Sequence, residues 1–153
     1  TKQLVVPRTL EIKGVSFVAQ PVKIGVGDWP LPEAERAVSW VHGTVINYVL
    51  GLEATPDNKS LLASLQSGDE LLLRMSTGPA YRFAYADTVR VSPQASEVFR
   101  QSRPGLTLAL LGDQEQSTRV VIRAVARATR RPKKHRAHHR LRCRATTASL
   151  NQN

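Results

Sequence analysis

The chain has 153 residues, of which 41% are hydrophobic and 22% charged, which excludes wholesale disorder and fits one domain with one core. We expect no signal peptide and no membrane anchor, because no signal pattern and no run of about 18 apolar residues occurs. The net charge of +10 is unevenly placed: all 12 acidic residues precede residue 127, whereas nine of the 22 Lys and Arg residues lie in 127–153. A near-neutral domain with a basic appendage is therefore predicted.

The first half of the chain is predicted to be mostly strands. Short apolar runs separated by turn signals occur at 4–7, 10–14, 15–20 and 22–24, and a longer β-branched and aromatic run at 45–52 predicts a buried strand. Asp57-Asn58 offers an N-cap for a short helix. On that helix Leu61, Leu62 and Leu65 recur at helical spacing, before Ser67-Gly68-Asp69 breaks the pattern.

The second half continues the strand pattern. Strands are predicted at 70–75, from Tyr81 through Val91, at 106–111 and at 118–126, and a short helix at 93–101 with proline at an early position. About eight short strands with one or two short helices favour an all-β, closed barrel over residues 1–126. After residue 126 the apolar pattern stops, and we predict that 127–153 is a disordered basic tail, because it has too little apolar surface to offset its ordering entropy.

Few residues of the chain offer chemistry of their own. The single cysteine, Cys143, lies in the predicted tail, so no intramolecular disulfide can form and the predicted barrel has no thiol. In the tail, the spacing of His135, His138, His139 and Cys143 is similar to that of zinc ligands. The surrounding cations would repel a metal ion and no scaffold shapes the site, so neither a metal nor a cofactor is predicted.

The order of several short motifs points to a known family. These are Val6-Pro7 before an aliphatic strand, Trp40 before the strand Asn47-Tyr48-Val49-Leu50, the helix end Leu65-Gln66-Ser67-Gly68-Asp69, and Gly105-Leu106-Thr107-Leu108 followed by a loop and Arg119-Val120-Val121-Ile122-Arg123-Ala124. In this order they resemble the sortases, bacterial extracytoplasmic cysteine transpeptidases built on a β-barrel. The resemblance covers roughly 4–126 and implies a location outside the cytoplasm or at the cell surface.

The resemblance also implies a site, and here the chain departs from the family. In sortases a cysteine at the end of the Leu-Thr-Leu strand attacks the carbonyl of a sorting-signal peptide, a histidine handles the leaving-group proton, and an arginine stabilises the oxyanion. Leu111 stands at the cysteine position, Glu53 at the histidine position, and only Arg119 matches in type. An isobutyl group cannot form an acyl-enzyme, and a carboxylate is a poor proton donor at neutral pH. The resemblance therefore implies a degenerate, noncatalytic domain.

Trp40, His42, Glu53 and Arg119 are the candidate binding residues, and the ligand implied is an extended peptide or a wall-associated partner. Trp29 and Trp40 can line a groove, since tryptophan offers flat apolar area with one donor, or they can plug the barrel. His42, the one histidine before the tail, is either a loop residue or, if the alignment slips by one strand, the catalytic histidine.

Two alternatives to a noncatalytic domain stay open. One is an active sortase-type transpeptidase whose nucleophile is misassigned, which requires Cys143 to fold back into the barrel. The other is an anion-binding protein that attaches to nucleic acid or an anionic surface through its tail. The tail has no aromatic residue on which a base could stack.

Overall fold

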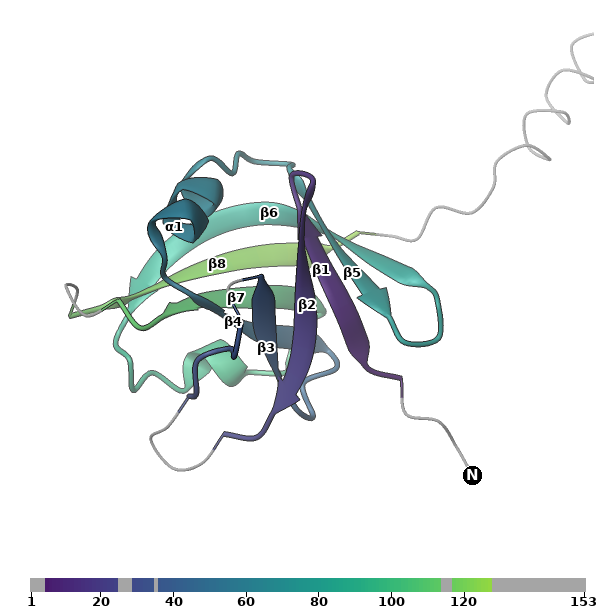
Figure 1. Ribbon diagram of the computed structural model, residues 1–153, viewed down its shortest axis with the longest axis horizontal. Helices are drawn as coiled ribbons and strands as arrows, with labels where there is room; N and C mark the ends of the chain where they lie inside the picture. The colour runs from purple at the N-terminus through teal and green to yellow at the C-terminus, as the bar shows by residue number, and fades with distance from the viewer. Residues whose placement is uncertain (1–4, 25–28, 35, 114–116, 128–153) are drawn as a thin grey trace, which may run out of the picture.

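Eight strands close into one barrel (Figure 1). The structure is a computed structural model that describes residues 5–24, 29–34, 36–113 and 117–127. The strands are β1 (Pro7–Ile12), β2 (Val15–Val22), β3 (Ala37–Val41), β4 (Asn47–Glu53), β5 (Glu70–Met75), β6 (Ala80–Val91), β7 (Gly105–Leu111) and β8 (Arg119–Ala126). Around the barrel they follow the order β1-β2-β3-β4-β7-β8-β6-β5, and β5 pairs with β1.

The predicted all-β closed barrel of about eight strands with one or two short helices is confirmed. Within the described ranges, the helices are α1 (Pro56–Ala63) and the 3-10 helix η1 (Glu97–Phe99). Neither is long and apolar enough to cross a bilayer. The predicted disordered tail, from residue 128 onward, lies outside the described residues, so the domain boundary at 126 stays a prediction.

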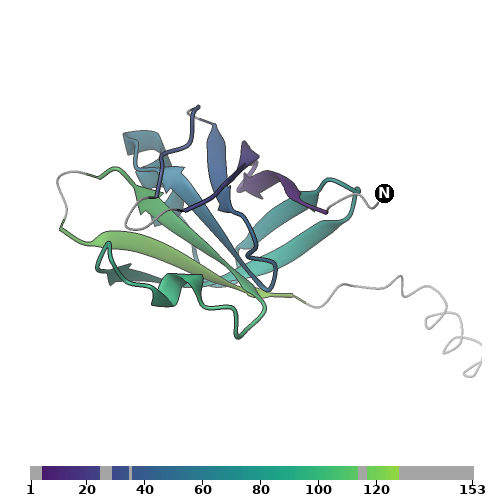
Figure 2. The ribbon, with the colours of Figure 1, turned by 90° about the horizontal axis from the view of Figure 1, so that it is seen from below.

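Alternation along the strands separates an inner from an outer apolar cluster. Because successive side chains point to opposite faces, Leu108 and Leu110 of β7 enter the main core inside the barrel, whereas Ala109 and Leu111 point outward. Outside, these two residues form a second cluster with Val98 and Val121, against which Trp29, Val89, Val91 and Phe99 pack. The outer cluster forms because the segment between β6 and β7, which contains η1, lies along the outside of this wall (Figure 2).

Helix α1 begins two to three residues earlier than the sequence predicts. The N-cap is Thr55, whose hydroxyl accepts a hydrogen bond from the Asn58 backbone N–H at 3.1 Å, and Pro56 follows it in the first turn. The predicted N-cap at Asp57-Asn58 is therefore wrong. Asn58 is buried and donates from its side chain to the Glu53 carbonyl at 2.9 Å, so it ties the helix to the end of β4.

Three other elements differ from the prediction. Strand β3 is not predicted from the sequence, because all five of its residues are buried and the run shows no apolar–polar alternation. The helix predicted at 93–101 is only the three residues of η1, and the residues after it bond to the start of β4 instead. Asn47 Nδ2 donates to the Arg100 carbonyl, and Gln101 Oε1 accepts from the Ile46 backbone N–H. The run predicted as a separate strand at 22–24 contributes only Val22, the last residue of β2.

Candidate functional site

Strand register brings the three residues of the predicted site to one edge of the barrel. β4 and β7 are parallel, and Glu53 pairs with Leu111 where both strands end. β7 and β8 are antiparallel, and Ala109 pairs with Val121, two residues from Leu111 and two from Arg119. Glu53 and Leu111 therefore end β4 and β7 at the place where Arg119 begins β8, as the resemblance implies.

Trp29 fills the space in front of Leu111. Leu111 is only 1% exposed and packs in the outer cluster against Trp29. Gly51, on the neighbouring strand, provides the space for this contact because it has no side chain. A Cβ added there would lie 2.5 Å from Leu111 Cδ1 and 2.9 Å from Trp29 Nε1. The end of β7, where the family has its nucleophile, is therefore an apolar contact closed by an indole ring.

Arg119 lies against the same indole. Its guanidinium carbon is 5.2 Å from the centre of the Trp29 ring, and Nη1 donates to the Pro93 carbonyl at 3.2 Å. Burial lowers the pKa of this guanidinium. Among the described residues Arg119 forms no ion pair, including none with Glu53. The guanidinium of Arg119 lies beside the apolar cluster and is held there by the Trp29 ring and the Pro93 carbonyl. Like other arginines in proteins it is charged.

Trp29 also carries an unsatisfied polar group. Its Nε1–H is buried and has no hydrogen-bond partner in the described part of the chain. Trp29→Phe removes this donor but keeps a ring against Phe99 and Arg119, so we expect the free energy of unfolding to stay unchanged or to rise by about 1 kcal/mol. Trp29→Ala, which removes the ring, should lower it by about 3 kcal/mol. Urea denaturation compares the two; an equal loss for both variants would show that the N–H has a partner.

The other two candidate binding residues lie elsewhere. Trp40 is 2% exposed inside the barrel, and its Nε1 donates to the Thr44 carbonyl at 2.9 Å. His42 follows β3, and its ring lies 5.7 Å from that of Trp40. Because β3 runs antiparallel to β4 and Trp40 pairs with Leu50, His42 lies about five residues, or about 16 Å, along the barrel from Glu53. The structure thus places Glu53 and Arg119 at the same end of the barrel, on strands separated by β7, and leaves Trp40 and His42 apart from them.

A separate groove runs along the outside of β7 and β8. Its volume is about 610 Å³, and it lies between these strands and the segment around η1. Its lining includes Val89, Val98, Arg103, Thr107 and Val121. At its side Arg123 donates to both carboxylate oxygens of Asp87, at 2.7 and 2.6 Å, and these bonds lower the Asp87 pKa. The groove offers an apolar wall with polar groups at its edges.

Asn47, which sequence reasoning did not single out as a site residue, lines the groove, and Gln101 bonds to it from behind. Asn47 Nδ2 donates to the Arg100 carbonyl at 3.1 Å, and Asn47 Oδ1 accepts from Thr107 Oγ1 at 2.9 Å. Gln101 Oε1 accepts from the backbone N–H groups of Ile46 and Asn47. The one signal in the sequence is an amide side chain at the start of an otherwise apolar strand.

The described residues contain no group of three or more His, Cys, Asp or Glu side chains that could hold a metal ion. The tail residues His135, His138, His139 and Cys143 lie outside the described residues. The predicted absence of a metal at these residues, and the alternative in which Cys143 is the nucleophile, therefore stay predictions.

Comparison with known proteins gives a consistent answer at the level of the fold. No protein-family model matches the sequence, and no curated protein matches it. Several solved structures, in contrast, match this chain in fold. Sortase A of Listeria monocytogenes superimposes with a TM-score of 0.63 at 14% identity over 81% of this chain and 88% of that one. The sortase D5 transpeptidase of Clostridium perfringens gives 0.61 at 14% identity over 78% of each chain.

Sortase C-1 of Actinomyces oris gives a TM-score of 0.62 at 16% identity over 79% of this chain and 71% of that one. Identities this low carry no information on activity. The agreement extends over most of the barrel, and it matches the family that the order of the motifs resembles. The closed barrel β1-β2-β3-β4-β7-β8-β6-β5 of this chain therefore has the sortase fold.

Proposed function

We propose that the chain is a degenerate member of the sortase family that binds an extended peptide or a wall-associated partner without forming an acyl-enzyme. The observation that carries the proposal is Leu111. It ends β7 in register with Glu53, is 1% exposed, and packs against Trp29. A nucleophile must present a lone pair to a substrate carbonyl, and at this position the barrel presents a buried aliphatic group.

The groove supports binding without chemistry. Its apolar residues suit peptide side chains. Arg103, which lines the groove, and Arg119, which pairs with the lining residue Val91, can donate to peptide carbonyls or to a carboxylate. Binding energy then serves to hold the peptide and not to reach a transition state. By the same resemblance we propose action at the cell surface, where the transpeptidases of this fold meet their substrates.

The catalytic part of the proposal is tested by restoring the missing sulfur. We expect no cleavage of sorting-signal peptides, taken from substrates of the three compared sortases, by the wild-type chain or by Cys143→Ser. Leu111→Cys in the Cys143→Ser background should also be inactive, since its thiol would be buried and would have Glu53 where the family has histidine. A thiol-reactive probe should label this variant at least about tenfold more slowly than unfolded protein. Peptide cleavage is followed by chromatography.

The outcome separates the proposal from its main alternative. Cleavage by the wild-type chain that disappears in Cys143→Ser would establish an active transpeptidase with its nucleophile in the tail. The binding part is tested separately by titrating the same peptides and following intrinsic fluorescence. Arg119→Gln should weaken binding by about tenfold, whereas Arg8→Gln, an exposed arginine on β1, should not. Equal losses in both variants would remove the groove from the proposal.

A further inference from the structure

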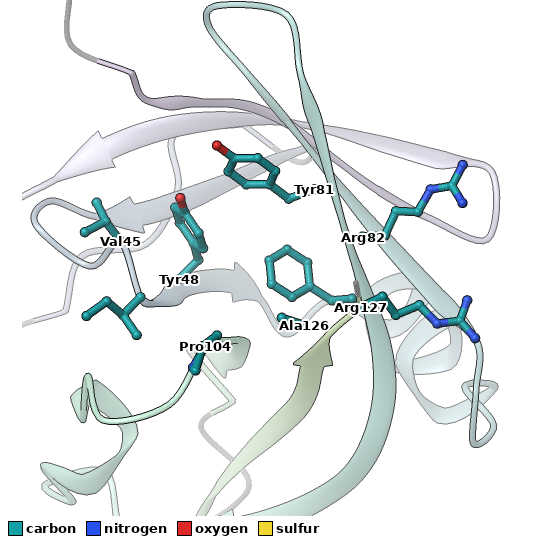
Figure 3. Close-up of a pocket in the computed structure, with 9 residues that line it drawn as sticks. Val45, Tyr48, Tyr81, Arg82, Pro104, Ala126 and Arg127 are labelled. Atoms are coloured by element: carbon teal, nitrogen blue, oxygen red, sulfur yellow. The ribbon is translucent and has the colours of Figure 1, made fainter. Parts of the chain in front are cut away.

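A second pocket opens at the end of the barrel opposite α1. It has a volume of about 390 Å³ and lies where β4 and β7 begin and β8 ends (Figure 3). It is lined by Val45, Ile46, Tyr48, Tyr81, Arg82, Phe83, Pro104, Ala126 and Arg127. Leu111 and Arg119 lie at the other ends of β7 and β8, so this pocket is separate from the candidate site.

The rim of this pocket is unusually apolar for a surface that faces water. Val45 is 55% exposed, Ile46 46% and Tyr81 37%, and these are three of the seven exposed large hydrophobic residues in the described ranges. Single exposed apolar residues need no explanation, but several around one concavity mark a binding surface.

The walls of the pocket define what it can hold. The Tyr48 ring lies 6.2 Å from the rings of both Tyr81 and Phe83, and Figure 3 shows the hydroxyls of Tyr48 and Tyr81 on the same side of the pocket. Burial and the neighbouring Tyr81 raise the pKa of Tyr48, so its hydroxyl stays protonated. The aromatic floor, with the aliphatic side chains of Val45 and Ile46 beside it, suits one bulky apolar side chain.

The charge beside the pocket is positive. Arg82 and Arg127 share one carboxylate: Glu70 Oε2 is 3.8 Å from Arg82 Nε and 3.4 Å from Arg127 Nη1. Figure 3 shows both guanidinium groups on the side of the pocket away from Val45 and Pro104. Arg127 also begins the 127–153 stretch, which has nine Lys and Arg residues and no acidic one. The pocket is thus bordered by two guanidinium groups that share one carboxylate, which leaves a net positive charge beside it.

We propose that this pocket docks an acidic polypeptide partner through one bulky apolar side chain. The apolar side chain enters between Tyr48, Tyr81 and the 45–46 loop. Acidic residues that flank it along the partner lie against Arg82 and Arg127. The pocket supplies specificity and the charge supplies long-range attraction, so the two contributions can be separated by salt.

A synthetic peptide with one tryptophan between glutamates tests the proposal on the full chain. Fluorescence polarisation measures its affinity at low and high salt, beside two control peptides: one with serine for tryptophan and one with glutamine for every glutamate. We expect each control peptide to bind at least about tenfold more weakly than the parent. Tyr81→Ser should weaken binding of the parent peptide by about tenfold, whereas Val18→Ser, at a more exposed apolar residue on β2, should have no effect.

Charge is tested in the same chain. Replacing Arg130, Arg131, Lys133 and Lys134 by glutamine should weaken binding at low salt and reduce the salt dependence, yet leave the tryptophan preference intact. The proposal is overturned if the serine peptide binds as well as the tryptophan peptide, which would reduce the interaction to attraction by the tail. It is also overturned if single-stranded DNA binds more tightly than the peptide and Tyr81→Ser weakens that binding, which would make this a nucleic-acid site.

Discussion

Replacing Gly51 by alanine should lower the free energy of unfolding by about 1 to 3 kcal/mol, although alanine is ordinarily the better residue within a strand. The added Cβ would lie 2.5 Å from Leu111 Cδ1, 2.8 Å from Ser39 Oγ and 2.9 Å from Trp29 Nε1. All three atoms belong to packed side chains, so movement of one would not relieve the others. Urea denaturation measures the loss, and an increase in stability would show that the space in front of Leu111 is open.

A double-mutant cycle with Leu111 identifies the cause of this loss. Leu111→Ala by itself should lower stability by about 2 to 5 kcal/mol, because Leu111 is fully buried. It also removes the methyl group nearest to the new Cβ, so Gly51→Ala should be less costly in that background, with a coupling of at least about 0.5 kcal/mol. Strict additivity would mean that Gly51 and Leu111 do not share the space that Trp29 closes.

Asn47→Ala is the second large effect that we expect. Truncation removes the bonds from Nδ2 to the carbonyls of Val98 and Arg100, and it leaves the buried Thr107 hydroxyl without its acceptor. An unsatisfied buried polar group costs about 1 to 3 kcal/mol. The segment around η1 should also exchange its amide protons faster, because two of its carbonyls lose their anchor to β4. Hydrogen exchange and urea denaturation measure the two effects.

The control for Asn47 removes both partners of the hydroxyl bond. In a Thr107→Val background no hydroxyl is left unpaired, so Asn47→Ala should cost less there than in the wild-type chain. The faster exchange of the η1 segment should persist, because its carbonyls still lack the amide donor. If the cost is the same in both backgrounds, the hydroxyl of Thr107 has another acceptor and the described bond does not stabilise the groove.

Part of the candidate site could be predicted from the chain alone. The motifs that mark the strands also mark where each strand begins or ends. Their order therefore sufficed to predict that Glu53, Leu111 and Arg119 lie at the ends of neighbouring strands. Trp40 and His42 show the limit. Their motif predicts that they precede β4, but the antiparallel pairing of β3 with β4 places Trp40 opposite Leu50, in the middle of β4, and His42 near the start of that strand. Such pairing is a long-range property that no local pattern records.

The sequence by itself determined the strand content, the closed barrel, the absence of any thiol before Cys143, and the concentration of positive charge after residue 126. Each of these depends on composition or on a period of two residues. Only the tertiary structure decided that Trp29 packs on Leu111 and Arg119, that β3 completes the wall, and that Asn47 holds the segment around η1. These contacts join residues far apart in the chain, and packing in three dimensions selects them among many alternatives that the local sequence allows equally well.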